Sequence, residues 1–165
     1  MVRRQMMAMA AVCGLALATL APRLDAQAGD LAIVVHPKTP VDNLTFPELR
    51  RVFLGDRQYW TPEMPVVLLV RGPTGPERDA VLNSIYQMKE PQFKQYWIAK
   101  VFRAETPSSP KIVATSGLAG QLVATIPGAI CFMTTGEVKP GTMKVLKIDN
   151  HLPGESGYKL HLTRK

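Results

Sequence analysis

Short apolar runs alternate with amphipathic segments along this chain. The runs at 31–35, 66–70 and 129–133 contain only apolar residues, which predicts strands buried on both faces of a sheet. In the segments between them, apolar residues recur every three or four positions, as on one face of a helix. This alternation predicts an α/β fold in which a mixed or parallel sheet is flanked by helices. Shorter strands are expected at 111–114 and 143–148, with an edge strand at 158–162 in the tail.

The segment after the first strand carries the start and stop signals of a short helix. Thr45 is placed to cap the helix, and Glu48, three residues later, completes a capping box. Leu44 and Leu49 have the spacing of a hydrophobic staple across this cap. Gly55 is a suitable residue for the end of the helix.

The stretch from Val66 to Met88 joins a buried strand to an amphipathic helix through a tight turn. Thr74 is placed as the helix cap, and Glu77 completes a second capping box. A helix N-terminus has free N–H groups and partial positive charge, and Arg71 and Arg78 flank this one, so the stretch predicts an anion site. The same pattern fits an ordinary strand–turn–helix unit, in which Arg71 forms a salt bridge, Thr74 is a plain cap and Arg78 faces solvent.

Two more helices are expected after Met88, with a loop at 56–65 whose Tyr59 and Trp60 cover the core. The first of these helices spans about 91–102, and the second is capped by Ser116. Their inward faces are expected to be formed by Phe93, Trp97 and Val101 in the first and by Leu118, Leu122 and Ile126 in the second.

Residues 1–28 have the layout of a secretory signal peptide. Arg3 and Arg4 precede an apolar run at 6–20, and a small-x-small cleavage site ends at Ala28. The apolar run is short for a membrane span, although an uncleaved anchor is the alternative. The sequence therefore predicts an exported protein, periplasmic or secreted.

Cleavage after Ala28 would leave one α/β domain over residues 29–165, with a loosely ordered, Gly-rich tail at 151–165. Cys131 is the only cysteine in this part, so no internal disulfide can form there and packing must supply the stability. We expect Cys131 to be a small buried hydrophobic residue. An exported chain without disulfides suits a bacterial periplasm.

The chain is basic, with a formal net charge of +7, which favours anionic ligands or surfaces. Its lysines and arginines are scattered and not interleaved with aromatic residues, which argues against nucleic-acid binding. His36, His151 and His161 lack the spacing of metal ligands, and no metal or cofactor is predicted. No Ser–His–Asp order, carboxylate pair or Cys–His pair stands out, so the sequence argues against an enzyme.

Several segments, taken in order, resemble the phosphate-type periplasmic solute-binding proteins of ABC transporters. The matching segments are LTFPELRRVFLG at 44–55 followed by Trp60, VLLVRGPT at 67–74, ATIPGAI at 124–130 followed by Cys131-Phe132 where the family has Gly-Tyr, and the run KID at 147–149 with Leu152-Pro153 and Tyr158-Lys159-Leu160. The resemblance implies one lobe of a type II periplasmic binding protein, in a reduced form, since full-length members have two lobes that close on the ligand.

The resemblance also implies a ligand site. The family motif R-x-x-G-S-G-T, which holds phosphate, can be matched with a one-residue gap by Arg71, Thr74 and Gly75. Pro76 stands where the family has its final Thr, and it supplies neither a hydroxyl nor an N–H. The function implied is the binding of phosphate or a related oxyanion for an ABC transporter. The alternative is a ligand-free module of the same fold that acts on another cell-envelope protein.

Overall fold

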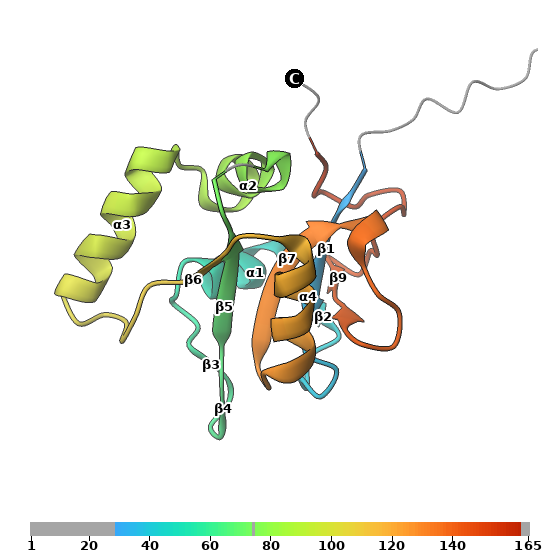
Figure 1. Cartoon of the computed structure of the whole chain (residues 1–165), viewed down its shortest axis with the longest axis horizontal. Coiled ribbons are helices and arrows are strands. Elements are labelled where there is room, and N and C mark those ends of the chain that lie inside the picture. Colours follow the sequence, from blue (N-terminus) through green and yellow to red (C-terminus); the bar gives the residue numbers. More distant parts are fainter. Residues whose placement is uncertain (1–28, 74, 163–165) are drawn as a thin grey trace, which may run out of the picture.

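A mixed five-stranded sheet with helices on both faces forms the centre of this protein (Figure 1). The structure is a computed structural model that describes residues 29–73 and 75–162; the expected signal peptide and Thr74 lie outside these ranges. The elements in chain order are β1 (Leu31–Val35), β2 (Asn43–Leu44), α1 (Phe46–Phe53), β3 (Tyr59–Thr61), β4 (Met64–Pro65), β5 (Val67–Arg71), α2 (Pro76–Val81), the π-helical turn η1 (Leu82–Tyr86), α3 (Glu90–Phe102), β6 (Lys111–Val113), α4 (Ser116–Thr125), β7 (Ala129–Thr134), the 3₁₀ turn η2 (Thr135–Glu137), β8 (Lys144–Val145) and β9 (Lys147–Ile148).

The strand order in the sheet is β6-β5-β7-β1-β8. β5 runs parallel to β6 and β7, whereas β1 runs antiparallel to both of its neighbours, β7 and β8. The predicted α/β fold with a mixed sheet flanked by helices is confirmed. No helix in the described ranges is both long and apolar enough to span a bilayer.

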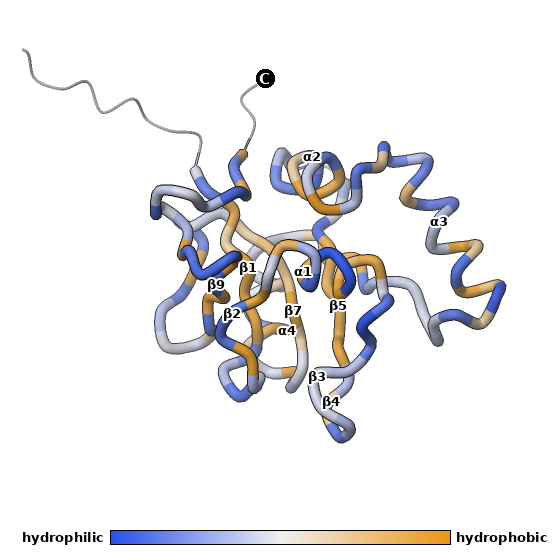
Figure 2. Tube along the Cα trace, turned by 180° about the vertical axis from the view of Figure 1, so that it is seen from behind, coloured by the Kyte–Doolittle hydropathy of each residue, from blue (hydrophilic) through white to orange (hydrophobic). Residues whose placement is uncertain are grey.

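Strand β1 shows why the apolar runs lack alternation. All five of its residues are buried, with Leu31 and Ile33 in the larger apolar cluster on one face and Ala32 and Val34 in the smaller cluster on the other. Because both faces of the sheet are covered, neither set of alternate side chains meets water. Figure 2 shows the same result as apolar colour along β1, β5 and β7.

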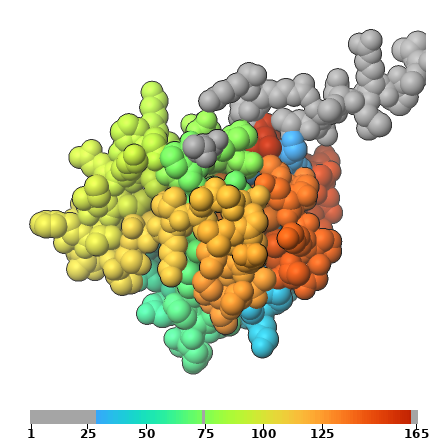
Figure 3. Space-filling model, viewed as in Figure 1, coloured from blue at the N-terminus to red at the C-terminus, as the bar shows by residue number. Residues whose placement is uncertain are grey.

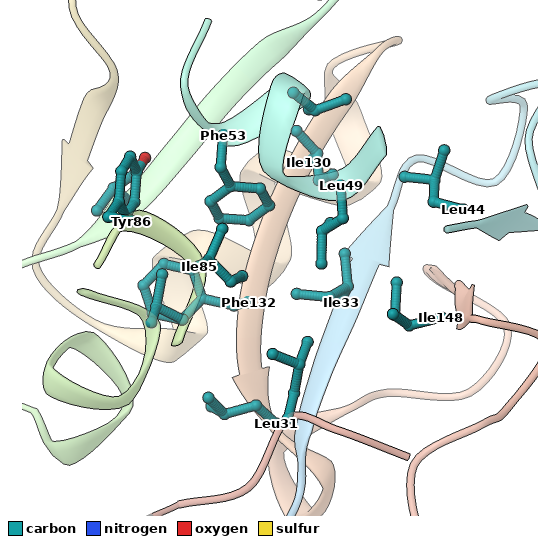
Figure 4. Packing of buried hydrophobic residues seen from close by; sticks show 14 of the residues in the cluster. Leu31, Ile33, Leu44, Leu49, Phe53, Ile85, Tyr86, Ile130, Phe132 and Ile148 are labelled. Atoms are coloured by element: carbon teal, nitrogen blue, oxygen red, sulfur yellow. The ribbon is translucent and has the colours of Figure 1, made fainter. Parts of the chain in front are cut away.

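The larger cluster lies between the sheet and the helices α1, α2 and α3 (Figure 4). Phe53 of α1 is at its centre, with ring centroids 6.0 Å from Tyr86 and 6.2 Å from Phe132. Ile33 and Ile85 are fully buried in the same cluster. Helix α4 covers the opposite face of the sheet.

The capped helix predicted near residue 45 is confirmed as α1. The Thr45 hydroxyl accepts a hydrogen bond from the Glu48 N–H at 3.4 Å, and the Glu48 carboxylate accepts one from the Thr45 N–H at 2.8 Å. Leu44 and Leu49 are both buried. Gly55 follows with φ +72°, and a Cβ there would lie 2.7 Å from the indole of Trp97, so glycine is needed at this position.

The predicted helix after β5 is less regular than its apolar spacing suggested. The N-cap is Gly75, not Thr74, and the cap makes no side-chain hydrogen bond. α2 gives way to the π-helical η1, where the Ser84 hydroxyl donates to the Ala80 carbonyl at 2.6 Å, a contact of the kind that bends helices. Gln87 then ends the segment with φ 57°.

Arg78, which the sequence placed in solvent, is buried, with 3% of its side chain exposed. Its Nε and Nη2 donate to the two carboxylate oxygens of Glu90 at 2.8 and 2.9 Å, and its Nη1 donates to the Arg71 carbonyl. The guanidinium also lies over the ring of Phe93, 4.8 Å from the centroid. The prediction was wrong because helical spacing within α2 gives no information about α3, which covers this side chain.

The inward faces of α3 and α4 were predicted only in part. In α3, Phe93 and Trp97 are buried, but Val101 is partly exposed. In α4, Ala119 and Val123 are fully buried. Of the expected stripe, Leu122 and Ile126 are partly buried against the smaller cluster, whereas Leu118 is 42% exposed and the prediction for it was wrong. The cap of α4 is Thr115, not Ser116. Small side chains face the sheet in α4 because they allow the helix to approach it closely, a preference that a count of large apolar residues overlooks.

Residues 56–65, expected as a loop, contain the short hairpin β3–β4. Trp60 is buried there and its Nε1 donates to the Gly128 carbonyl at 2.9 Å, while Tyr59 is exposed. The strand expected at 143–148 is divided into β8 and β9, which belong to different sheets.

Within the described part of the tail, residues 151–162, side chains pack into the core, although the composition suggested loose order. Tyr158 and Leu160 are buried in the larger cluster. The Tyr158 hydroxyl donates to the Leu31 carbonyl at 2.5 Å, and the Leu31 N–H donates to the Leu160 carbonyl at 3.0 Å. No strand forms at 158–162, where Asp30 and His161 make an isolated bridge.

We predict that Arg78→Ala lowers the free energy of unfolding by about 2–3 kcal/mol, because it removes charge-assisted hydrogen bonds from a buried site. Urea denaturation followed by circular dichroism measures this change. The matched control is Arg103→Ala, since Arg103 also pairs with a glutamate, Glu105, but its side chain is 60% exposed. The control should change the stability by less than about 0.5 kcal/mol, and equal effects of the two substitutions would contradict the prediction.

Candidate functional site

The carboxyl ends of the parallel strands β5, β6 and β7 meet at one edge of the sheet. Arg71 is the last residue of β5 and pairs with Val113 of β6, and the Gly72 N–H donates to the Val113 carbonyl at 2.9 Å. Thr134 ends β7 and is followed by η2. In open α/β sheets this edge is where ligands bind, so the side chains collected here form the candidate site.

Arg71 is the central basic group at this edge. Its side chain is 12% exposed, and its Nη1 lies 3.9 Å from a carboxylate oxygen of Glu137. That distance is too long for a hydrogen bond, and both Nε and Nη1 are buried without a hydrogen-bond partner among residues 29–73 and 75–162. Buried N–H groups are costly when unsatisfied, so Arg71 has donors for which the described part of the chain provides no acceptor.

Glu137 faces Arg71 from η2. Its carboxylate accepts a hydrogen bond from the Thr134 N–H at 3.0 Å. Burial raises the pKa of Glu137, but hydrogen bonds from Ser116 and Thr134 and the charge of Arg71 lower it more, so the net pKa lies below its usual value. Glu137 is therefore ionised at neutral pH and competes with any anion for Arg71.

The second half of the predicted site is the start of α2. Gly75 is the N-cap, and Glu77 turns back over it, with a carboxylate oxygen 2.3 Å from where a Cβ on Gly75 would lie. That oxygen of Glu77 is buried and has no hydrogen-bond partner among the residues that the structure describes. Arg71 and Gly75 thus flank the same turn, whereas Thr74, between them, lies outside the described residues. The Glu77 carboxylate therefore lies near the N-terminus of α2, where the sequence predicted that an oxyanion binds.

A polar cavity of about 240 Å³ adjoins Glu137 at the N-terminal end of α4. It is lined by Ser116, Gly117, Gly120, Gly136, Glu137, Val138, Lys139 and Met143. The N-terminus of α4 is capped by the Thr115 hydroxyl, which accepts from the Leu118 N–H at 3.2 Å. The cavity combines a helix N-terminus and Lys139 with the negative charge of Glu137, so its polarity is mixed.

The sequence prediction included Arg71 in the candidate site but did not include Glu137, which faces Arg71 in the structure. A signal was present, since Thr134 and Glu137 have the spacing of a capping box, and the structure forms that box around η2. The pattern sits directly after the buried run at 129–133, which is the position where a strand end enters a site.

The histidine and cysteine side chains in the described parts of the chain form neither a metal site nor a reactive nucleophile. No group of three or more His, Cys, Asp or Glu side chains is arranged there to hold a metal ion. The His36 Nδ1 accepts a hydrogen bond from the Lys38 N–H at 3.1 Å, which orders a turn. Cys131 is fully buried as predicted, and burial raises the pKa of its thiol to about 12, so it is not a reactive nucleophile.

Known structures share this fold. An ABC-type phosphate transport receptor from Vibrio cholerae matches with a TM-score of 0.60 and 18% identity over 77% of this chain. A phosphate ABC transporter substrate-binding protein from Clostridium perfringens, solved with bound phosphate, matches with a TM-score of 0.58 and 21% identity over 75% of this chain. PstS from Borrelia burgdorferi matches with a TM-score of 0.60 and 15% identity over 76% of this chain.

The match covers 50%, 47% and 49% of those three chains, so this chain spans about half their length. No protein-family profile matches the sequence, and no curated protein sequence does. The resemblance to phosphate-type solute-binding proteins, and to one half of them, is therefore confirmed for the fold.

We predict that Glu137 contributes stability that is lost in acid. Its folded-state pKa lies below the ordinary value of 4.5, so its contribution is fully present above pH 4.5 and disappears as pH falls through the folded-state pKa. In Glu137→Gln this component is absent, and the free energy of unfolding should decline less steeply below pH 4.5 than in the unmodified protein.

Urea titrations at a series of pH values between about 3 and 7 measure this difference. Glu63→Gln is the matched control, because Glu63 is exposed in the β3–β4 turn. Parallel pH profiles for the unmodified protein and Glu137→Gln would contradict the prediction.

Proposed function

We propose that this protein is an exported solute-binding domain that holds phosphate or a related tetrahedral oxyanion at Arg71, Thr74 and Gly75. In this proposal it delivers the anion to an ABC transporter in the periplasm and performs no chemistry on it. Residues 1–28 direct export, and residues 29–165 form the binding domain. Its relation to phosphate receptors by fold supports the ligand class, and the structural argument comes from Arg71.

The observation that carries the proposal is the buried guanidinium with unsatisfied Nε and Nη1 groups. A guanidinium offers donors in a planar fork, which suits the oxygens of a tetrahedral oxyanion. Arg71 lies at the carboxyl edge of parallel strands, and the Arg78 side chain donates to its carbonyl and fixes its backbone. A ligand oxygen near Nε would satisfy donors that the free protein leaves unpaired.

The same geometry implies weak binding. Glu137 and Glu77 place two carboxylates close to the proposed anion, and each repels a second negative charge. Pro76 also removes one N–H donor from the start of α2. The carboxylates of Glu137 and Glu77 therefore offset part of the positive charge at the proposed site. Removing one of them should increase the affinity for the anion.

We predict that phosphate and sulfate give saturable heat in isothermal titration calorimetry and that Arg71→Ala abolishes it. Glu137→Gln should bind about three- to tenfold more tightly, because it removes one partly exposed repulsive charge. Glu63→Gln, which changes the net charge equally at a remote exposed position, should leave the affinity unchanged.

Circular dichroism must show that Arg71→Ala is folded, and Arg71→Lys, which keeps the charge but loses the fork, provides a second test. Absence of saturable heat with both anions in the unmodified protein and in Glu137→Gln would overturn the proposal. The alternative, a ligand-free module that acts on another envelope protein, would then be the better account of the fold.

A further inference from the structure

The cavity beside Glu137 has room for part of a ligand. Its volume is about 240 Å³, and it lies between the first turns of α4 and the segment that follows β7. Figure 3 shows these two parts of the chain side by side on one face of the molecule. Gly117, Gly120 and Gly136 line the cavity, and a Cβ on Gly117 or Gly136 would meet no atom of the described chain within 4 Å beyond its immediate neighbours. The space is therefore open because three lining residues have no side chain.

Glu137 connects this cavity to Arg71. Its Oε1 lies 3.9 Å from the Arg71 Nη1, and the same side chain lines the cavity. Its other oxygen, Oε2, accepts the hydrogen bond from the Thr134 N–H at 3.0 Å, which holds the carboxylate in place. The Glu137 side chain is 30% exposed, so it remains accessible to a ligand. A molecule bound at Arg71 therefore has both Glu137 and the cavity within reach.

The charges of Arg71 and Glu137 are only loosely paired with each other. The separation of 3.9 Å is too long for a hydrogen bond, and the Arg71 Nε and Nη1 have no hydrogen-bond partner among residues 29–73 and 75–162. A plain anion at Arg71 would satisfy the guanidinium but would be repelled by Glu137. A ligand that carries an ammonium group beside its anionic group would satisfy both side chains. The charges at this edge of the sheet therefore favour a zwitterion.

We propose that the ligand is a small zwitterionic phosphorus compound, a phosphonate or a phosphate monoester in which a two-carbon linker carries an ammonium group. Its oxyanion binds Arg71, its ammonium group pairs with the Glu137 carboxylate, and its linker occupies the cavity. This inference rests on the proposed function, because it assigns the ligand class of the same Arg71 site. The two charged groups of such a compound are about 4–5 Å apart, comparable with the 3.9 Å between the Arg71 and Glu137 side chains.

The size of the cavity and the other charges near it are consistent with this ligand. A volume of about 240 Å³ lies below the range of roughly 300–1,000 Å³ for pockets that hold drug-sized molecules, so it suits a linker of a few atoms. Lys139 also lines the cavity, but it is exposed, so solvent screens its repulsion of an ammonium group. Glu77, near Gly75, is a second carboxylate that disfavours a plain anion at Arg71.

Isothermal titration calorimetry of the full chain tests this assignment with inorganic phosphate, ethylphosphonate, 2-aminoethylphosphonate and β-alanine. The chain should bind 2-aminoethylphosphonate at least about fivefold more tightly than ethylphosphonate, because only the former has an ammonium group for Glu137. β-Alanine keeps the ammonium group but has a carboxylate in place of the phosphonate. It should bind at least about fivefold more weakly than 2-aminoethylphosphonate, because it offers the guanidinium of Arg71 fewer oxygens and less charge.

Glu137→Gln should change the affinities for the two kinds of ligand in opposite directions. The affinity for inorganic phosphate and ethylphosphonate should rise, because a repulsive charge is removed, whereas the affinity for 2-aminoethylphosphonate should fall, because its ammonium group loses a partner. The preference for 2-aminoethylphosphonate over ethylphosphonate should therefore disappear. A general structural effect of the substitution would shift all three affinities in the same direction. Glu63→Gln, which removes an exposed charge in the β3–β4 turn, is the control and should leave the preference unchanged.

Filling the cavity tests where the linker lies. Gly117→Leu should weaken 2-aminoethylphosphonate at least about fivefold and change the affinity for inorganic phosphate by less than about twofold, because phosphate does not enter the cavity. Gln121→Leu, at an exposed position of α4 that does not line the cavity, is the matched control and should change neither affinity. Circular dichroism must show that the variants are folded, and Gly136→Leu fills the same cavity from η2 as a second variant.

The outcomes separate this inference from the proposed function. If phosphate binds through Arg71 but 2-aminoethylphosphonate has less than a fivefold advantage over ethylphosphonate, or keeps its advantage in Glu137→Gln or in both leucine variants, only the zwitterion assignment fails. If neither phosphate nor any phosphonate binds, both proposals fail. Binding of β-alanine as tight as that of 2-aminoethylphosphonate would assign the site to amino acids. O-phosphoethanolamine should bind more tightly than its diester glycerophosphoethanolamine, and equal affinities would assign the site to a lipid headgroup instead.

Discussion

The buried guanidinium of Arg78 connects three elements that otherwise share few contacts. Arg78 belongs to α2, and its guanidinium donates hydrogen bonds to the carbonyl of Arg71 at the end of β5 and to the carboxylate of Glu90, the first residue of α3. Hydrogen bonds from Arg78 keep the pKa of Glu90 below its usual value, so the pair is charged on both sides at neutral pH. The turn that carries the candidate anion site and the start of helix α3 are therefore positioned by one side chain.

The Arg78–Glu90 pair is a charged centre that adjoins both the turn after β5 and the start of α3. On one side of it, Arg71 meets Glu137 at 3.9 Å, a separation that leaves its donors unsatisfied. On the other side, Arg78 and Glu90 are polar lining residues of an open, mostly apolar groove of about 730 Å³ along α3.

The sequence was a good guide wherever the signal was local. The doubly buried strands β1 and β7, the capped helix α1 and the fold class could all be predicted, because apolar runs and capping residues act over a few positions. Burial of Arg78 and exposure of Ile98 and Phe102 could not, because both depend on where α3 packs. In α4, Ala119 and Val123 are the most buried residues, whereas the larger Leu122 and Ile126 are only partly buried beside them and Leu118 is exposed.

Strand β1 has a consequence for how the chain reaches its native state. Leu31 pairs with Thr134, and Val34 pairs with Val145, so the first strand of the chain lies between two strands that are synthesised near its end. Contacts of such long sequence separation carry a large loop-closure entropy and slow the search for the native topology. Until β7 has emerged, an apolar ribbon with unpaired edges is exposed, which makes the growing chain a natural client for chaperones.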